Sequence, residues 1–309
     1  MLPNTFVAGA QKSGTTTLCS ALARHPQVIV SEPKEPIFFS KAANLARPEL
    51  YEACFRKKPD AEPRTVIDGS NAYMSDPAAV SRIRETLGSD LRFIFSLRDP
   101  VSRMISAYWH QAKKRQEHRS LVEALCLESS SLNEAVQEEE ERLSRAAVGG
   151  LISVETYADR YDDPLWNFRY LRNSLYAADL NRFQDTFGAA RIMVVLFEDV
   201  VEKPLQTLSK LAKFLDLDPE AFPAELNLHL NPTRLARAQG LLATLRRLPG
   251  IGSLRRVPGY APLSHALFYR RPDSAPPEFT TRCRRLFAPE VARLQTMLGR
   301  DLVSLWCRA

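Results

Sequence analysis

Short apolar runs alternate with longer stretches of helical spacing along most of the chain. Buried strands are predicted at residues 5–10, 28–30, 65–68, 91–97 and 191–197. Helices are predicted at residues 15–22, 47–58, 78–87, from 99 onward, 173–187, 204–215 and 280–306. Strands that alternate with helices build a mostly parallel sheet covered by helices. The pattern therefore predicts an α/β fold of three layers, with a central sheet flanked by helices.

The length of 309 residues fits one large α/β domain or two small ones. We interpret residues 1–309 as a single domain with two additions. The polar and aromatic stretch at about 112–165 is predicted to be a helical excursion, whose acidic run at 137–142 is solvated. The segment at about 227–277, rich in Pro, Gly and Arg, is predicted to be a loop or lid. In the helix at 47–58, Leu50, Tyr51 and Cys54 are expected to face inward.

Composition and charge exclude several classes of protein. The net charge of +6 mildly favours an anionic ligand. Zinc-finger spacing, an RNA-recognition signature and a long basic helix are missing, so nucleic acid is not expected as a partner. Five scattered cysteines without a C-x-x-C pair are expected to be free thiols, with no metal site. No apolar run is long enough to span a bilayer, and the first strand begins close to Met1, so we expect a cytoplasmic protein.

The first candidate site follows the first strand. Gly9 and Gly14 bracket a polar turn, and a helix is predicted to begin at Thr15. A strand, a turn and a helix N-terminus together form an anion cradle. The G-x-x-x-x-G spacing is that of a Walker A loop, but Thr15 and Thr16 stand where Lys and Ser/Thr belong, and the lysine is Lys12. This P-loop-like turn predicts a phosphate site, with an ordinary glycine turn as the alternative.

The second candidate site follows the strand at 91–97. Asp99 and Pro100 are a favourable N-cap and first residue of a helix. Arg98 at the strand end and Ser106, about two turns into the helix, can converge on one phosphate. The alternative is a helix serine that bonds back to its own turn.

The third candidate site is the loop at 31–40, after the second strand. Pro33 and Pro36 exclude a regular helix or central strand there. Lys34 and Glu35 lie between them, at the sheet edge where open α/β sheets place ligand contacts. The alternative for Glu35 is a solvated loop carboxylate.

The joint order of these motifs resembles the sulfotransferases that use 3′-phosphoadenosine 5′-phosphosulfate (PAPS). The resemblance rests on Lys-Ser-Gly-Thr-Thr at 12–16, Lys-Glu-Pro-Ile-Phe-Phe at 34–39, and the pair Arg98 and Ser106. It extends from residue 5 to 306 and is closest to the heparan-sulfate or carbohydrate-type branch and its bacterial relatives.

The resemblance implies a mechanism and a set of site residues. Glu35 would be the general base, and Lys12 and Lys34 would assist at the sulfuryl group. The 5′-phosphate would be held by Lys12, Ser13, Gly14, Thr15, Thr16 and Thr17, and the 3′-phosphate by Arg98 and Ser106. The donor is PAPS, the product is adenosine 3′,5′-bisphosphate, and no metal is required. The acceptor would be a hydroxyl of a carbohydrate, glycolipid or other small metabolite, and the resemblance leaves a homodimer open.

One position departs from the resemblance. Heparan-type enzymes often carry a lysine where this chain has Gly69, so Lys34 or a basic residue of 227–277 would have to replace it. Two other readings remain open from sequence: a P-loop kinase or nucleotide hydrolase, and a non-catalytic nucleotide-binding protein.

Overall fold

The fold is built on one five-stranded sheet, seen in a computed structural model that describes residues 1–56, 62–125, 128–223, 235–236, 269–270 and 275–307. The strands are β1 (Thr5–Gly9), β2 (Val28–Val30), β3 (Thr65–Asp68), β4 (Arg92–Leu97) and β5 (Ile192–Leu196). All neighbours pair in parallel, in the order β2-β3-β1-β4-β5. The prediction of a parallel sheet flanked by helices is confirmed.

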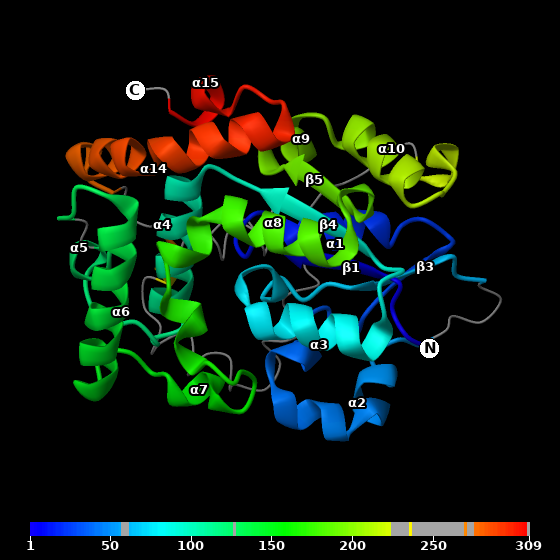
Figure 1. Cartoon of the computed structure of the whole chain (residues 1–309), viewed down its shortest axis with the longest axis horizontal. Coiled ribbons are helices and arrows are strands. Elements are labelled where there is room, and N and C mark those ends of the chain that lie inside the picture. Colours follow the sequence, from blue (N-terminus) through cyan, green and yellow to red (C-terminus); the bar gives the residue numbers. More distant parts are fainter. Residues whose placement is uncertain (57–61, 126–127, 224–234, 237–268, 271–274, 308–309) are drawn as a thin grey trace.

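Helices cover both faces of this sheet (Figure 1). The helices near the sheet are α1 (Thr15–Leu22), α3 (Pro77–Leu87), α8 (Tyr176–Phe187), α9 (Phe197–Glu202) and α10 (Pro204–Phe214). Alternate strand residues point to opposite faces. Phe6, Phe93 and Phe95 therefore pack against α3 and α8, whereas Val7 and Ile94 pack against α1 and α10.

A second group of helices stands beyond the carboxyl ends of the strands, at the left of Figure 1. It comprises α4 (Pro100–Lys113), α5 (Leu121–Ala124), α6 (Leu132–Val148) and α7 (Glu155–Ala158). These helices share a core with the short 3₁₀ helix η4 (Pro164–Phe168), and α4 also contacts the 3₁₀ helix η5 (Arg172–Ser174). The polar stretch after α4 thus packs around a hydrophobic cluster of its own.

The acidic run at 137–142 is only partly solvated. Glu139 is buried, and its carboxylate accepts hydrogen bonds from the backbone N–H groups of Leu171 (2.7 Å) and Arg172 (2.8 Å). Periodicity alone did not predict this role, because the bonded N–H groups belong to a segment 32 and 33 residues away. Burial raises the pKa of Glu139.

Two predicted helices are shorter than expected. The helix at 47–58 is limited to α2 (Pro48–Glu52), where Tyr51 is buried while Leu50 is half exposed, so the expectation for Leu50 is wrong. The helix at 280–306 divides into α14 (Pro277–Leu298) and α15 (Leu302–Trp306). Gly299 ends α14 in the left-handed conformation (φ 61°), and the Asp301 carboxylate then caps α15.

The C-terminal helices are tied to α9. Trp306 Nε1 donates to Glu198 Oε1 (3.3 Å), and Arg300 Nη1 pairs with Asp199 Oδ2 (2.8 Å).

Most of the predicted lid at 227–277 lies outside the described residues. Within it, the short strands β6 (Leu235–Ala236) and β7 (Tyr269–Arg270) pair antiparallel.

We expect Glu139→Ala to lower the free energy of unfolding by about 3 kcal/mol, because two buried N–H groups would lose a charged acceptor. Urea unfolding followed by circular dichroism measures this. Glu141→Ala on the same helix is the control, since the Glu141 side chain is 69 % exposed and should change stability by less than about 0.5 kcal/mol. Equal effects of the two substitutions would show that the buried contacts of Glu139 do not stabilise the fold.

Candidate active site

The three sequence motifs meet at the carboxyl edge of the sheet. β1 leads into the turn at 10–14, β2 into the loop at 31–37, and β4 into Arg98. The chain connects β1 to strands on one side and later crosses to β4 and β5 on the other. Such a switch point leaves a crevice beyond the strand ends, where open α/β sheets bind ligands.

The turn at 10–14 is tight and leads directly into the N-terminus of α1. Lys12 (φ 71°) and Gly14 (φ 81°) both adopt the left-handed conformation. The Ser13 carbonyl accepts from Ser96 Oγ (2.6 Å), which fixes the turn to β4. The Ser13 N–H donates to the Ala10 carbonyl (3.2 Å), so the turn itself uses this donor. The N–H groups that have no acceptor within α1 are those of its first turn, which begins at Thr15.

A fully buried arginine, Arg103, forms a hydrogen bond to the backbone of the turn. Arg103 of α4 donates from Nη1 to the Gln11 carbonyl (3.5 Å), from Nε to Ser174 Oγ (2.6 Å) and from Nη2 to the Tyr170 carbonyl (2.5 Å). No carboxylate among the described residues pairs with it. Burial lowers the pKa of Arg103, yet guanidinium remains charged at neutral pH. Its positive charge therefore adds to the potential that the turn presents to an anion.

Phe197 brings Arg98 to the turn. A Cβ atom on Gly14 would lie 2.7 Å from Cδ2 of the Phe197 ring, so only glycine allows this approach. The Arg98 guanidinium carbon lies 4.9 Å from the centroid of the same ring. The aromatic ring thus fixes the spacing between the two predicted phosphate-binding elements.

Ser106 lies on the face of α4 that faces the turn. Residues 103, 106 and 110 share one stripe of a helix, being spaced i, i+3 and i+7. Arg103 contacts Gln11, and His110 Nδ1 lies 3.5 Å from Lys12 Nζ. Ser106 therefore sits between two contacts to the turn, whereas Ser102 is bonded to the N-cap Asp99 (2.6 Å).

Positive charge accumulates around Lys12. Burial, together with the charges of Lys114, Lys113 and Arg98, lowers the pKa of Lys12 to about 8. Burial, together with the charge of Lys12, lowers the pKa of His110 to about 3, so the imidazole is neutral at physiological pH. A neutral imidazole is an acceptor for the Lys12 ammonium. Lys12 is therefore an amine that gains its proton more easily when an anion is bound next to it.

Two side chains donate hydrogen bonds both to Glu35 and to Thr15, the first residue of α1. Glu35 Oε1 accepts from Lys34 Nζ (2.7 Å) and Asn71 Nδ2 (2.8 Å). Both donors also reach Thr15 Oγ1, at 3.1 Å from Lys34 and 3.4 Å from Asn71. Oε2 of Glu35 has no hydrogen-bond partner among the described residues. One carboxylate oxygen is oriented and the other is available to a substrate.

Gly69 makes room for Lys34. A Cβ atom at position 69 would lie 2.7 Å from the Lys34 carbonyl oxygen and 3.1 Å from Lys34 Cε. The lysine side chain therefore crosses the space that a residue at 69 would fill. Of the two expected replacements for a lysine at position 69, Lys34 lies next to this position, and the basic residues of 227–277 are almost all outside the described residues, so the replacement stays a prediction.

The structure brings most of the predicted residues together. Lys12, Gly14 and Thr15 lie in or next to the turn, Lys34 and Glu35 contact Thr15, and Arg98 reaches the turn through Phe197. Thr16 is exposed at the helix start, while Thr17 is buried with the side of α1 that packs on the sheet. Sequence reasoning missed five residues that shape the site: Gln11, Asn71, Arg103, His110 and Phe197. Asn71 and Phe197 follow strand ends at the same sheet edge, which was the available signal.

Comparison with known proteins defines the family. Residues 2–239 match the sulfotransferase domain family. The chain is 26 % identical over 270 residues to the membrane-associated sulfotransferase kil1 of Dictyostelium discoideum, covering 70 % of this chain and 56 % of kil1. It is 26 % identical over 238 residues to heparan sulfate glucosamine 3-O-sulfotransferase 5 of Mus musculus, covering 75 % and 58 %. The chain belongs to the sulfotransferase family.

A solved structure shares the whole fold. The sulfotransferase from Alicyclobacillus acidocaldarius aligns over the full length of both chains, with a TM-score of 0.63 and 24 % identity. This chain spans a little over half the length of the two curated relatives above. None of the helices that the structure describes is long and apolar enough to cross a membrane. In the same described ranges, no three His, Cys, Asp or Glu side chains are grouped to hold a metal ion.

The lowered pKa of Lys12 predicts a pH-dependent affinity for anions. Above pH 8 the free protein loses the Lys12 proton, so binding of adenosine 3′,5′-bisphosphate should weaken by about tenfold per pH unit. The ligand's phosphates are fully ionised in this range. Calorimetric titration between pH 7 and 9.5 measures the effect. Lys12→Met should bind the bisphosphate weakly, with an affinity that does not change with pH. If this variant kept the pH dependence, the dependence would belong to another cation.

The stability of the protein without ligand should change with pH in the opposite direction. Between pH 8 and 10.5 native Lys12 binds fewer protons than unfolded Lys12, so the contribution of Lys12 to stability rises there.

Proposed function

We propose that the enzyme transfers the sulfuryl group of PAPS to a hydroxyl of a carbohydrate, glycolipid or other small metabolite. Adenosine 3′,5′-bisphosphate is the second product. The observation that carries this proposal is the pair of donors, Lys34 and Asn71, that contact both Glu35 and Thr15. They place a carboxylate next to the first turn of α1, where an anionic donor would bind.

Each residue group has a role in this reaction. The helix start and Lys12 bind the 5′ end of the donor, and Arg98 with Ser106 binds the 3′-phosphate. Glu35 accepts the acceptor's hydroxyl proton on Oε2 while the new oxygen–sulfur bond forms. The bond from sulfur to the bridging oxygen of the departing nucleotide breaks on the opposite side. Lys12 and the first-turn N–H groups stabilise the negative charge that develops there.

A carbohydrate acceptor is supported by one named relative. The Mus musculus enzyme is described as a glucosamine 3-O-sulfotransferase, and it covers three quarters of this chain. A kinase or nucleotide hydrolase is not favoured, because Thr15 Oγ1 is bonded to Lys34 and Asn71 and no lysine directly follows Gly14.

Donor binding is testable without an acceptor. Adenosine 3′,5′-bisphosphate at a hundredfold excess over Kd should stabilise the protein by about 2.7 kcal/mol, seen as a rise in Tm, whereas Mg-ATP should have little effect. Arg98→Ala should raise the Kd of the bisphosphate by about ten- to a hundredfold, through loss of a charge-assisted contact. Arg84→Ala, at an exposed position of α3, is the control. A larger rise in Tm with Mg-ATP would reverse the assignment of the nucleotide.

The role of Glu35 is tested by turnover. Glu35→Gln should lower kcat by about a thousandfold, because the amide cannot accept the proton, and should leave the affinity for the bisphosphate nearly unchanged. Transfer of labelled sulfuryl groups to a panel of glycans and lipid alcohols measures this. Glu32→Gln, an exposed glutamate of the same loop, should retain full activity. Full activity of Glu35→Gln would assign the base to another residue.

A further inference from the structure

A polar segment at the edge of the sheet is almost fully buried. It begins at Asp68, the last residue of β3, and both Asp68 and Ser70 are completely buried, while Asn71 is 7 % exposed. Segments that leave a strand usually run over the surface, because buried polar groups need hydrogen-bond partners. Here the partners come largely from residues 31–40, which carry Glu35 and are called the Glu35 loop below. Beyond the bond from Asn71 to Glu35, the two segments are joined through their backbones.

A serine hydroxyl joins the start of the Glu35 loop to the chain after β3. Ser31 Oγ donates to the Lys34 carbonyl (2.7 Å) and accepts from the Gly69 N–H (3.4 Å). The Ser31 N–H donates to the Ile67 carbonyl of β3 (2.9 Å). The start of the loop is therefore fixed to the sheet, and Glu35 directly follows a bonded carbonyl.

A second serine hydroxyl contacts a strained residue just after Glu35. Ile37 adopts the left-handed conformation (φ 55°, ψ 29°), which is unfavourable for a β-branched side chain. Its N–H donates to Ser70 Oγ (2.9 Å), and this bond is buried. Its side chain is 2 % exposed and packs in the hydrophobic cluster around α4. Strain of this kind persists only where the surrounding contacts enforce it, so we attribute the turn at Ile37 to Ser70 and to this packing.

Asp68 in turn fixes Ser70. Its carboxylate accepts hydrogen bonds from the Ser70 N–H (2.8 Å), Tyr51 OH (2.7 Å) and Tyr73 OH (3.2 Å). The Tyr73 hydroxyl also accepts from the Phe39 N–H (3.4 Å). A buried carboxylate without such donors would be unfavourable, and a buried network whose members are all bonded is rigid. Asp68 therefore holds Ser70 and, through Tyr73, a residue near the end of the Glu35 loop.

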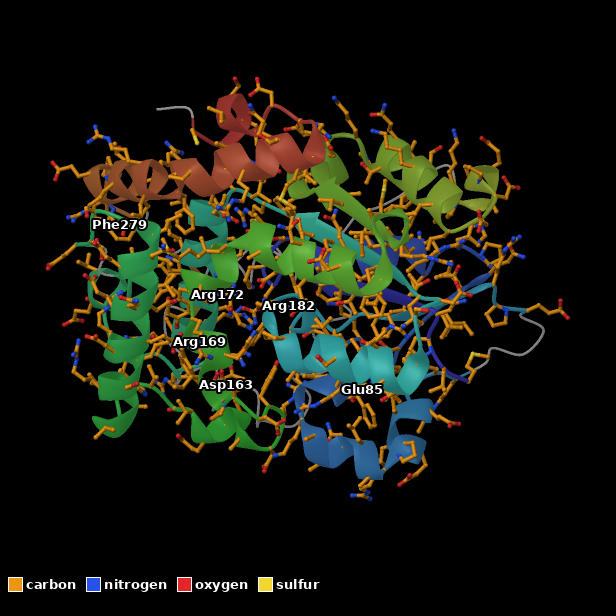
Figure 2. The ribbon with its side chains drawn as sticks, viewed as in Figure 1. Glu85, Asp163, Arg169, Arg172, Arg182 and Phe279 are labelled. Carbon is orange, nitrogen blue, oxygen red and sulfur yellow. The ribbon has the colours of Figure 1, made fainter. Side chains whose placement is uncertain are left out.

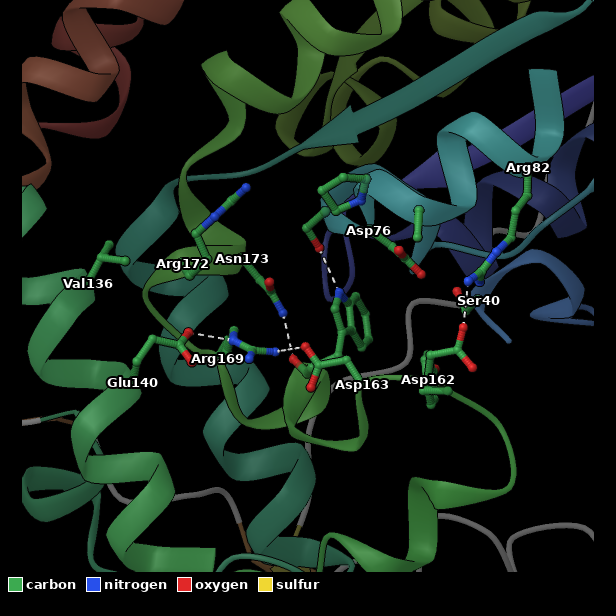
Figure 3. A pocket seen from close by; sticks show the side chains of 15 residues that line it. Ser40, Asp76, Arg82, Val136, Glu140, Asp162, Asp163, Arg169, Arg172 and Asn173 are labelled. Atoms are coloured by element: carbon green, nitrogen blue, oxygen red, sulfur yellow. Dashed lines mark hydrogen bonds and ion pairs between the residues drawn. The ribbon is translucent and has the colours of Figure 1, made fainter. Parts of the chain in front are cut away.

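The end of the Glu35 loop is tied to α3 and to the segment at 161–173. Arg82 of α3 donates from Nη1 to the Phe39 carbonyl (2.9 Å) and pairs through Nη2 with Asp162 (2.6 Å; Figure 3). The next residue, Asp163, pairs with Arg169, and Figure 2 shows these two side chains next to each other. The loop is thus held at both ends, and shifting it as a whole would break contacts at each of them.

We propose that Ser70 is a positioning residue for the Glu35 carboxylate and acts through the turn at Ile37. Its hydroxyl keeps this turn in the strained conformation, and the turn directs the free oxygen Oε2 of Glu35 towards the acceptor hydroxyl. Ser70 is fully buried and contacts neither substrate. This inference rests on the proposed function, because it adds a residue that orients the base of that reaction.

Hydrogen exchange tests the turn without any substrate. Ser70→Ala removes the acceptor of the Ile37 N–H, so exchange of this amide proton should become at least about tenfold faster. The Ile94 amide of β4, an internal strand, is the reference for opening of the whole sheet. NMR on protein labelled with ¹⁵N-isoleucine measures both, and the Ile37 signal is the one missing from Ile37→Val. Equal acceleration of the two amides, or none at Ile37, would overturn the proposal.

Turnover tests the effect on Glu35. Ser70→Ala should lower kcat by about ten- to a hundredfold, because the base is misplaced, and should change the Kd of adenosine 3′,5′-bisphosphate by less than about twofold. Labelled PAPS is the donor, and transfer is measured to the panel of glycans and lipid alcohols and to water, which gives free sulfate. In the Glu35→Gln background the same substitution should lower kcat no further, because only a carboxylate that accepts the proton depends on its position.

Two further variants control for a purely structural effect. Thr207→Val removes another buried hydroxyl, which joins α10 to α9, and should leave kcat unchanged. Tyr73→Phe removes one hydroxyl of the network around Asp68, should give a smaller loss of kcat, and serves if Ser70→Ala does not fold. The positioning role is overturned if both network variants keep the wild-type kcat, or if the effect of Ser70→Ala is undiminished in the Glu35→Gln background.

The outcomes separate this inference from the proposed function. If the bisphosphate does not bind, or if Glu35→Gln stays fully active, the proposed function or its base is wrong whatever Ser70→Ala does. If the bisphosphate binds and Glu35→Gln is inactive while Ser70→Ala turns over as the wild type does, only the role of Ser70 is wrong.

Discussion

The hydrogen bonds from Lys34 and Asn71 to both Glu35 and Thr15 join two parts of the site that are far apart in sequence. Glu35 belongs to the loop after β2, Asn71 to the loop after β3, and Thr15 to the helix after β1. Because β2, β3 and β1 are neighbours in the sheet, their carboxyl ends bring these loops into contact. A movement of α1 would therefore also move the carboxylate. The fold therefore holds the Glu35 carboxylate and the start of α1 together as one unit.

The other half of the site depends on concentrated positive charge. Burial and the charges of Lys114, Lys113 and Arg98 lower the pKa of Lys12, and the buried Arg103 adds a further cation next to the turn. Such an arrangement is unfavourable in the empty protein and becomes favourable when an anion enters. The surrounding helices hold these charges in place, since α4 supplies Arg103 and His110 and its own N-terminus follows directly on Arg98.

The sequence was sufficient for elements whose signal is local. Apolar runs located all five strands of the sheet, and spacing placed Lys12, Glu35 and Arg98 at the correct strand ends. It was insufficient where the decisive partner is distant. From sequence, Glu139 was predicted to be solvated like its acidic neighbours. In the structure its carboxylate accepts hydrogen bonds from two backbone N–H groups of the segment at 171–172. Phe197 was predicted only as the last residue of a strand. Its contacts with Gly14 and Arg98 join residues far apart in the sequence, so the sequence pattern did not predict them. The division of the last helix at Gly299 depended on a left-handed residue that periodicity does not reveal.

The close approach of Lys34 to Gly69 constrains how the site can change. A side chain at 69 would collide with the backbone carbonyl of Lys34 as well as with its side chain, so it requires the loop after β2 to shift. An ammonium group can therefore reach this corner from one strand end or from the neighbouring one, but not from both at once. The two positions are expected to covary, and an engineered exchange would have to move the amine and restore glycine in a single step.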